Sequence, residues 1–259
     1  MPLQIGIFGR GRLGSAIAAA AETAEDIDIA WQVGRDLPQE LTPVDVAVEV
    51  SHADAVADRL AWARESGTDL VIGTTGWDPD LLSPAPYPGL LTPAPSAAQP
   101  TAEQPGAAAP ANGILTAPNF SLTVALMRRI SLALGRYAAL TGADLAVSEV
   151  HHTRKADAPS GTALLLREAL RAGSGQEDVQ TSSLRLGAVV GRHDVHLNSS
   201  AESITLTHEA HSREIYGLGA LTAARWLHGR RGIFTFDDLA AEVLDPLFSP
   251  EPQTTSVPA

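Results

Sequence analysis

The chain has 259 residues, which is enough for one large or two modest domains with a hydrophobic core. It contains no cysteine, which excludes disulfide bonds and thiolate chemistry, and its formal net charge of -12 argues against a nucleic-acid-binding protein. The N-terminal segment has no basic region, and the apolar run at residues 3–8 is too short for a signal peptide or a membrane span. We therefore expect a cytoplasmic protein with no nucleic acid and no membrane as a partner.

Strands and helices are predicted to alternate along the first half of the chain. The hydrophobic patterns indicate strands at residues 3–8, 27–33, 44–50, 69–73 and 113–117, and helices at residues 15–24 and 53–66. This order is typical of right-handed βαβ units, so we expect an α/β fold with a Rossmann-like, doubly wound parallel sheet. Residues 83–112 interrupt the pattern with eight prolines and few branched apolar side chains, which predicts a flexible insert.

A second domain is predicted to follow this sheet. Ser121 fits the N-cap of a helix that reaches about residue 137, residues 143–150 form a strand, and a helix runs from Pro159 to about residue 171. Residues 183–208 indicate strands of a largely antiparallel sheet, and helices at 218–228 and 236–244 are expected to return to the first domain. The expected domains are 1–118 with 214–248, an α+β domain with an open mixed sheet at 119–213, and a disordered tail at 249–259.

A glycine-rich turn links the first predicted strand to the first helix. Its sequence, Gly9-Arg10-Gly11-Arg12-Leu13-Gly14, fits the G-x-G-x-x-G pattern of dinucleotide-binding turns. The first glycine permits the tight turn, the second lets a pyrophosphate approach the backbone, and the third allows close packing of helix and strand. The helix N-terminus offers free N–H groups to phosphate, so we expect these six residues to bind a dinucleotide.

The end of the second predicted strand bears on the choice of coenzyme. An acidic residue is typical there when a site binds the ribose 2′-hydroxyl of NADH, but this chain has Gly34 and then Arg35. An arginine can pair with the 2′-phosphate of NADPH. We therefore favour NADPH, and NADH stays open because Arg35 can equally be a solvated surface charge.

The only lysine of the chain, Lys155, lies in a segment rich in proton-transfer groups. A lysine can lose a proton when its pKa is tuned, whereas an arginine stays charged, and His151 and His152 stand just before it. Further along, Ser160, Gly161 and Thr162 open a helix and offer backbone N–H groups to an anion. The combination of acid, cation and anion site predicts a small acidic substrate next to a nicotinamide.

Two histidine pairs are candidate metal ligands. They are His193 with His196 and His208 with His211, all in the region predicted to form strands. On a strand, residues three apart face opposite sides of the sheet, so neither pair makes a two-ligand arm. We therefore predict no metal site.

Five motifs, in order and spacing, resemble those of the dihydrodipicolinate reductases (4-hydroxy-tetrahydrodipicolinate reductases). The strongest match is Glu149-x-His151-His152-x-x-Lys155-x-Asp157-Ala158-Pro159-Ser160-Gly161-Thr162-Ala163. The others are the glycine turn, Gly73-Thr74-Thr75-Gly76, Ala117-Pro118-Asn119-Phe120-Ser121, and the later matches from Arg185-x-Gly187 through Gly191-x-His193 to Gly219-Ala220.

The resemblance implies roles for individual residues. His151 would be the acid, Lys155 the proton donor, and His152 a substrate-binding residue. Ser160, Gly161 and Thr162 would bind substrate, the last two as a carboxylate clamp. Gly73, Thr74 and Thr75 would line the nicotinamide, and Ala117, Asn119 and Phe120 would complete the coenzyme site, with the last two at a hinge.

The resemblance also implies the reaction, which is NAD(P)H-dependent reduction of a small cyclic imine dicarboxylate to tetrahydrodipicolinate in lysine and diaminopimelate biosynthesis. The middle domain would bind substrate and build a homotetramer through its sheet. Three alternatives stay open from the sequence. They are a reductase of another small imine or keto acid, a non-catalytic nucleotide-binding regulator on the same fold, and a metal hydrolase built on the histidines.

Overall fold

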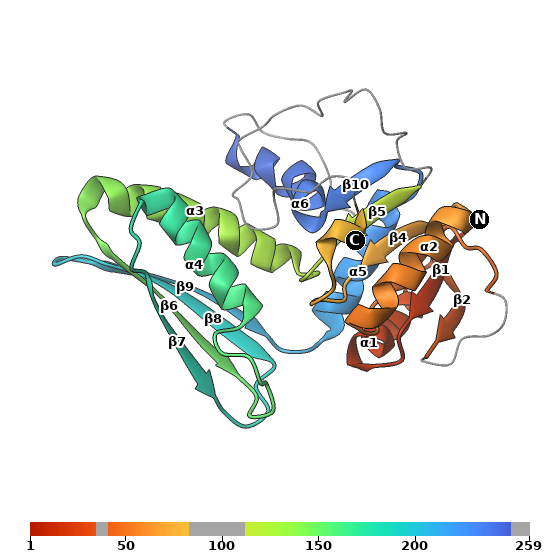
Figure 1. Cartoon of the computed structure of the whole chain (residues 1–259). Coiled ribbons are helices and arrows are strands. Elements are labelled where there is room, and N and C mark those ends of the chain that lie inside the picture. The colour runs from red at the N-terminus through yellow and green to blue at the C-terminus, as the bar shows by residue number, and fades with distance from the viewer. Residues whose placement is uncertain (35–40, 83–111, 250–259) are drawn as a thin grey trace. The chain divides into compact units, whose positions relative to one another are not determined.

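The chain folds into two compact units, which are drawn in Figure 1. In this computed structural model the described residues are 1–34, 41–82 and 112–249. The first unit combines Met1–Phe120 with Glu214–Ala259, and the second is Ser121–Arg213. Arg35, the predicted insert up to residue 111 and the predicted tail beyond Ser249 lie outside the described residues.

The first unit is built on a parallel sheet with the strand order β10-β5-β4-β3-β1-β2. Its strands are β1 (Leu3–Phe8), β2 (Ile27–Val33), β3 (Val46–Glu49), β4 (Asp69–Ile72), β5 (Gly113–Thr116) and β10 (Gly232–Thr235). Its helices are α1 (Arg12–Ala21), α2 (Val56–Ser66), α5 (Glu214–Leu227) and α6 (Phe236–Leu244), with short 3-10 helices η1 (Ala53–Ala55), η2 (Pro79–Leu82) and η3 (Asp245–Phe248). The predicted Rossmann-like parallel sheet is confirmed.

The central strands of this unit lie in its hydrophobic core. Every residue of β3, β4 and β5 is buried, as is typical of parallel strands that are covered on both faces. Val56 and Leu60 of α2 join one apolar cluster with Phe8 and Leu70, while α5 packs on α1 and contacts β3, β4 and β5. Because parallel strands all end at one edge, the loops that follow β1, β3, β4 and β5 share that edge.

The second unit is a mixed sheet with two helices on one face. Its elements are α3 (Leu122–Thr141), β6 (Asp144–His151), α4 (Gly161–Ser174), β7 (Gln180–Arg185), β8 (Gly191–Asn198) and β9 (Ser203–Ala210). The strand order is β7-β6-β8-β9, with β6 parallel to β7 and antiparallel to β8, and β8 antiparallel to β9. The predicted α+β domain with an open mixed sheet is confirmed.

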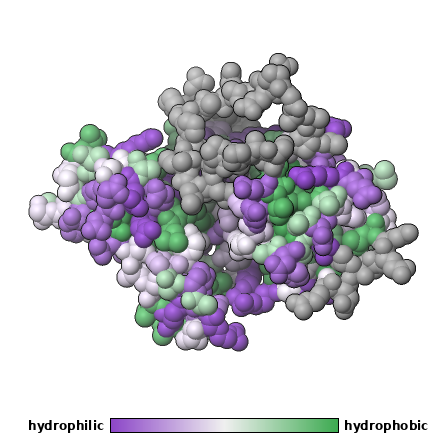
Figure 2. Space-filling view, in the orientation of Figure 1, coloured by the Kyte–Doolittle hydropathy of each residue, from purple (hydrophilic) through white to green (hydrophobic). Residues whose placement is uncertain are grey.

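Strand alternation decides which side chains of the second unit form its core. Leu145 and Val147 of β6 cluster with Leu166 and Leu170 of α4, so the helices cover the face that carries the odd-numbered residues of β6. On the face of the described residues that Figure 2 shows, hydrophilic and hydrophobic residues are interspersed. Within the described ranges, no helix is long and apolar enough to cross a membrane.

Some element boundaries differ from the prediction for identifiable reasons. Helix α1 begins at Arg12 instead of residue 15, because Gly11 takes the extended backbone conformation of an N-cap. Helix α3 begins after the predicted N-cap Ser121 but runs on to Thr141, where Gly142 ends it in the left-handed conformation with φ of 71°. Strand β10 was not predicted, since its four residues gain their partner only through pairing with β5.

Helices α1 and α5 pack closely against each other at Gly217. A Cβ atom at Gly217 would overlap the carbonyl oxygen of Ala16, a backbone atom that cannot move without shifting α1. Gly217→Ala should therefore lower the free energy of unfolding by about 1–3 kcal/mol, even though alanine is the better helix former. Urea denaturation measures this loss. In the matched control Gly161→Ala, the added methyl meets no atom within 4 Å, and stability should be unchanged or higher. Equal stability of the two variants would contradict the packing.

Candidate active site

The glycine turn has the geometry that a dinucleotide requires. Gly9 has φ of 130°, and a Cβ there would lie 2.8 Å from the carbonyl oxygen of Val50, while a Cβ at Gly14 would overlap the backbone of Gly9. Gly11 is exposed, and a Cβ there would meet no atom within 4 Å. Gly11 also caps α1 without a side-chain hydrogen bond. The turn therefore presents an open backbone surface and uncapped N–H groups, which fits a pyrophosphate.

The two arginines of the turn lie differently. Arg10 donates from Nε and from one terminal nitrogen to the carbonyl oxygen of Gln32, at 3.2 and 2.9 Å. Gln32 in turn donates to the carbonyl oxygen of Gly9 at 2.9 Å, so Arg10 braces the ends of β1 and β2. Arg12 is exposed at the first turn of α1, where Leu13 is half-buried.

A buried carboxylate that the sequence analysis missed orders two loops of the first unit. Glu49 has a fully buried side chain and accepts from the backbone N–H of Ser51 at 2.7 Å, the Ser51 hydroxyl at 2.5 Å and the Thr74 hydroxyl at 3.1 Å. Its second oxygen is 3.6 Å from Nε of Arg59, whose guanidinium lies 4.6 Å from the centre of the Phe8 ring. Glu49 thereby fixes the loops after β3 and β4.

The remaining residues predicted for the coenzyme divide into exposed and buried ones. Thr75 is exposed, and Gly73 is needed because a Cβ there would overlap the Phe120 ring. Phe120 is only 2% exposed and packs edge-on against Phe236, and Ala117 is only 1% exposed. Ala117 and Phe120 can therefore reach a ligand only through their backbone, and Asn119 between them is half-buried.

In the second unit, the strand that ends in His151 places a second buried carboxylate beside it. The Glu149 side chain is fully buried, and its Oε2 lies 3.3 Å from Nδ1 of His151. Its Oε1 accepts from the backbone N–H of Ser160 at 3.0 Å, the Ser183 hydroxyl at 2.7 Å and the Arg185 guanidinium at 3.0 Å. Burial alone would raise the pKa of Glu149, but these donors overcome it and lower the pKa to about 2.

His193 completes this cluster from the opposite strand. It pairs with Glu149 in the β6–β8 register, its Nε2 lies 3.6 Å from Glu149 Oε2, and its ring centre is 5.0 Å from that of His151. Burial lowers the pKa of His193 to about 4, and burial also lowers the pKa of His151 against the opposing pull of Glu149. Both rings therefore favour the neutral form at neutral pH.

The same cluster revises how the histidines bear on a metal. Strand alternation places His196 on the other face of the sheet, where it bonds the Ser148 hydroxyl at 2.9 Å, so the two histidines do not act as a pair. However, one ligand atom each from Glu149, His151 and His193 lie within 4.8 Å of one another. The sequence analysis examined pairs within one strand and did not consider this cross-strand set; its prediction of no metal stays a prediction.

Lys155 and the start of α4 lie close to this cluster in the chain. Nζ of Lys155 lies 2.7 and 2.8 Å from the two carboxylate oxygens of Asp157, and its backbone N–H donates to the carbonyl of His152, which is half-buried. Ser160 is buried, and its hydroxyl accepts from the backbone N–H of Ala163 at 3.1 Å as the N-cap of α4. The same hydroxyl lies 3.2 Å from Nε2 of His193, so Ser160 is already bonded, and the exposed residue at this helix start is Gly161.

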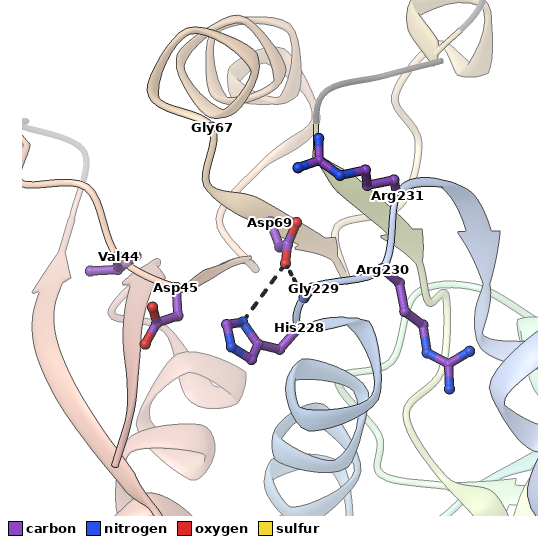
Figure 3. A pocket seen from close by; sticks show the side chains of 8 residues that line it. All are labelled: Val44, Asp45, Gly67, Asp69, His228, Gly229, Arg230 and Arg231. Atoms are coloured by element: carbon purple, nitrogen blue, oxygen red, sulfur yellow. Dashed lines mark hydrogen bonds and ion pairs between the residues drawn. The ribbon is translucent and has the colours of Figure 1, made fainter. Parts of the chain in front are cut away.

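A pocket of the first unit lies at the edge of the sheet where β4 begins, away from the predicted coenzyme site. Figure 3 shows its lining residues, which are Val44, Asp45, Gly67, Asp69, His228, Gly229, Arg230 and Arg231. Asp69 begins β4, and its two oxygens accept from the backbone N–H groups of Gly113 at 2.7 Å and Gly229 at 2.9 Å. This edge is opposite to the one where β1, β3 and β4 end, so we assign Asp69 a structural role.

His193 also predicts how the stability of the protein depends on pH. Because its pKa is lowered to about 4, the unfolded chain binds a proton that the folded chain does not bind between about pH 6.5 and pH 4. The free energy of unfolding should therefore fall by about 2 kcal/mol through this group on acidification to pH 4.5. The stabilisation from Glu149 is lost at lower pH, as the pH falls from about 4.5 towards 2, so a comparison of pH 7 with pH 4.5 reports mainly on His193.

Urea denaturation of the wild type and of His193→Asn at pH 7 and pH 4.5 measures this effect. The variant should lose less stability between the two pH values, because it has no imidazole whose protonation favours unfolding. An equal loss in both proteins would mean that His193 is protonated in the folded state.

Comparison with known proteins agrees with this architecture. Residues 3–83 match the family model for the dihydrodipicolinate reductase N-terminus, and residues 121–240 match the model for its C-terminus. The 4-hydroxy-tetrahydrodipicolinate reductase of Gluconobacter oxydans is 35% identical over 91% of this chain and 96% of that protein, and the one of Nocardia farcinica is 31% identical over 90% and 96%. A solved structure of dipicolinate-bound dihydrodipicolinate reductase from Paenisporosarcina sp. TG-14 has a TM-score of 0.69 at 16% identity, covering 92% of this chain and 100% of that one, so it has the same fold. The chain belongs to the dihydrodipicolinate reductase family.

Proposed function

We propose that this chain reduces 4-hydroxy-tetrahydrodipicolinate to tetrahydrodipicolinate with a nicotinamide coenzyme, in lysine and diaminopimelate biosynthesis. The observation that carries the proposal is the grouping, in one short segment, of His151, Lys155 and the open first turn of α4 at Gly161. Relatives named for this reaction match over 90 to 91% of the chain, which supports the same substrate class.

The substrate is a six-membered ring with two carboxylates, and the second unit offers groups for both charges. The first turn of α4 exposes Gly161, where an added Cβ would meet no atom within 4 Å, and Thr162 follows it. Lys155 supplies a cation at the other end of the segment, and we assign His152 to substrate binding. The dipicolinate bound in the solved relative is also a six-membered nitrogen ring with two carboxylates, which supports the substrate class.

The chemistry requires the loss of the 4-hydroxyl group as water, which leaves a carbon–carbon double bond conjugated with the imine, and then the addition of a hydride and a proton. When bound, the coenzyme supplies a hydride from C4 of its nicotinamide to a ring carbon conjugated with the imine. The residues of this chain provide the proton, and Lys155 is the donor we propose, with His151 as a second acid in its protonated form. Asp157 holds Nζ of Lys155 in place through an ion pair at 2.7 Å. A positioned acid of this kind is worth roughly 10²–10⁴-fold in rate.

The first unit is proposed to hold the coenzyme at the carboxyl edge of its sheet. The turn from Gly9 to Gly14 would bind the pyrophosphate, and the loop at Gly73–Thr75, which Glu49 orders, would line the nicotinamide. Backbone groups of Ala117, Asn119 and Phe120 would complete the site. We favour NADPH over NADH on account of Arg35, whose place at the end of the second strand suits a 2′-phosphate.

We also propose a homotetramer in the cytoplasm, where a chain without cysteine suits reducing conditions. The face of the second sheet that α3 and α4 leave uncovered carries an ordered polar network, which supports an interface there. Asp194 is buried on this face and accepts from Thr207 at 2.6 Å and from Arg192 at 3.1 Å. Such a network on an uncovered face fits pairing with another copy of the sheet.

The proposed activity is tested by the loss of absorbance at 340 nm from NADPH, and separately from NADH. The imine is made in situ from pyruvate and aspartate semialdehyde by its synthase. Oxidation that depends on this substrate is expected, with a lower Michaelis constant for NADPH than for NADH. Arg35→Ala should remove that preference. No oxidation with either coenzyme, in protein that binds the nucleotide, would point to a different imine or keto acid.

Replacement of Lys155 tests the proton donor. Lys155→Arg keeps a cation but cannot give up a proton, so it should retain more substrate affinity than Lys155→Ala. Both variants should lose turnover by about 10²-fold or more, since each lacks the acid. Arg136→Ala removes an exposed cation from the same unit and serves as the control. Near-wild-type turnover of Lys155→Arg in steady-state kinetics would reject the role.

A further inference from the structure

We propose that Glu149 is the positioning residue of the reductase site, because its two carboxylate oxygens fix the ring tautomer of His151 and the start of α4 at the same time. The proposal rests on the function proposed above and adds a residue to it. The Glu149 side chain has no exposed surface, so its effect passes through His151 and through the first turn of α4.

The first step concerns the His151 ring. Oε2 of Glu149 and Nδ1 of His151 are both buried and lie 3.3 Å apart, at ion-pair distance, and within the described part of the chain neither atom makes a hydrogen bond. Because an ionised carboxylate is negatively charged and can only accept a hydrogen bond, this contact favours the tautomer with the proton on Nδ1. The other nitrogen, Nε2, is then the one that can gain and lose a proton.

The second step concerns the space at Nε2. A Cβ atom at Gly191 would lie 3.0 Å from Nε2, so any other residue at the start of β8 would crowd this edge of the ring. The ring is therefore held at Nδ1 and left uncrowded at Nε2. This is the orientation in which a histidine can exchange a proton with a ligand.

The third step links the acid to the anion site. Oε1 of Glu149 accepts from the backbone N–H of Ser160 at 3.0 Å, and the Ser160 hydroxyl caps α4 by accepting from Ala163 at 3.1 Å. Ser183 and Arg185 of β7 donate to the same oxygen, at 2.7 and 3.0 Å. One side chain thus sets the distance between the proton-exchanging ring and the turn that carries Gly161.

The charges around His151 give the direction of the pH effect. Glu149 and Asp157 favour the protonated ring, whereas burial, Lys155 and Arg185 oppose it. His193 faces both Glu149 and His151 from β8, and it stays neutral because its pKa is about 4. It therefore adds no positive charge that would offset the effect of Glu149 on His151. Loss of the Glu149 charge should shift protonation of His151 to lower pH.

The experiment combines NMR of the ring nitrogens with kinetics. In the wild type, ¹⁵N–¹H correlation spectra of the histidine rings, with His151 assigned from its absence in His151→Gln, should show Nδ1 protonated and Nε2 bare at neutral pH. In Glu149→Gln, the titration of His151 should move to lower pH, and kcat should fall about 10- to 100-fold with the Michaelis constant for NADPH unchanged. Glu168→Gln, an exposed acid on α4, is the matched control for charge.

Three results would overturn the proposal. One is a wild-type His151 with its proton on Nε2, which is readable even if Glu149→Gln does not fold. Another is an unchanged His151 titration in a folded Glu149→Gln protein. The third is stoichiometric zinc bound by the wild type and lost in Glu149→Gln, because a metal would then occupy Nδ1. All three are independent of turnover, so failure of the proposed reduction is distinguished from failure of the positioning role.

Discussion

A carboxylate with no exposed surface is the constraint on which the second unit depends. An ionised group removed from water is strongly unfavourable unless donors surround it, and Glu149 has three donors on one oxygen and two histidines facing the other. These groups come from β6, β7, β8 and the start of α4, which are far apart in the sequence. To stabilise the buried charge, the fold must bring all of these groups together. They meet beside the residues proposed to bind the substrate and to transfer the proton.

The first unit also has a buried carboxylate with hydrogen-bond donors around it, at the edge of its parallel sheet. Glu49 ends β3 with its side chain fully buried, and its hydrogen bonds to Ser51 and Thr74 hold the loops after β3 and β4. The glycine turn differs, because its close backbone contacts leave no room for a side chain at Gly9 or Gly14. The edge that we propose to bind the coenzyme thus combines loops that hydrogen-bond to the buried Glu49 carboxylate with a glycine turn whose backbone is open.

Local features of the sequence predicted much of this, and long-range pairing limited the rest. The strand at Ile27–Val33, the N-cap at Ser121 and the glycine turn depend on neighbouring residues, so their patterns were sufficient. Strand β10 has four residues and pairs with a strand more than a hundred residues earlier, which no local pattern reveals. The cluster of Glu149 and His193 depends on the register of β6 against β8, so the sequence analysis could name Glu149 within a motif without seeing its role.

The central claim is that the chain transfers a hydride directly from a nicotinamide coenzyme to a cyclic imine dicarboxylate. It is tested most directly with NADPH that carries deuterium at both C4 positions, followed by mass spectrometry of the product. The account predicts a tetrahydrodipicolinate with one deuterium bound to a ring carbon. A product of natural mass, or unchanged substrate in the presence of a bound coenzyme, would contradict it.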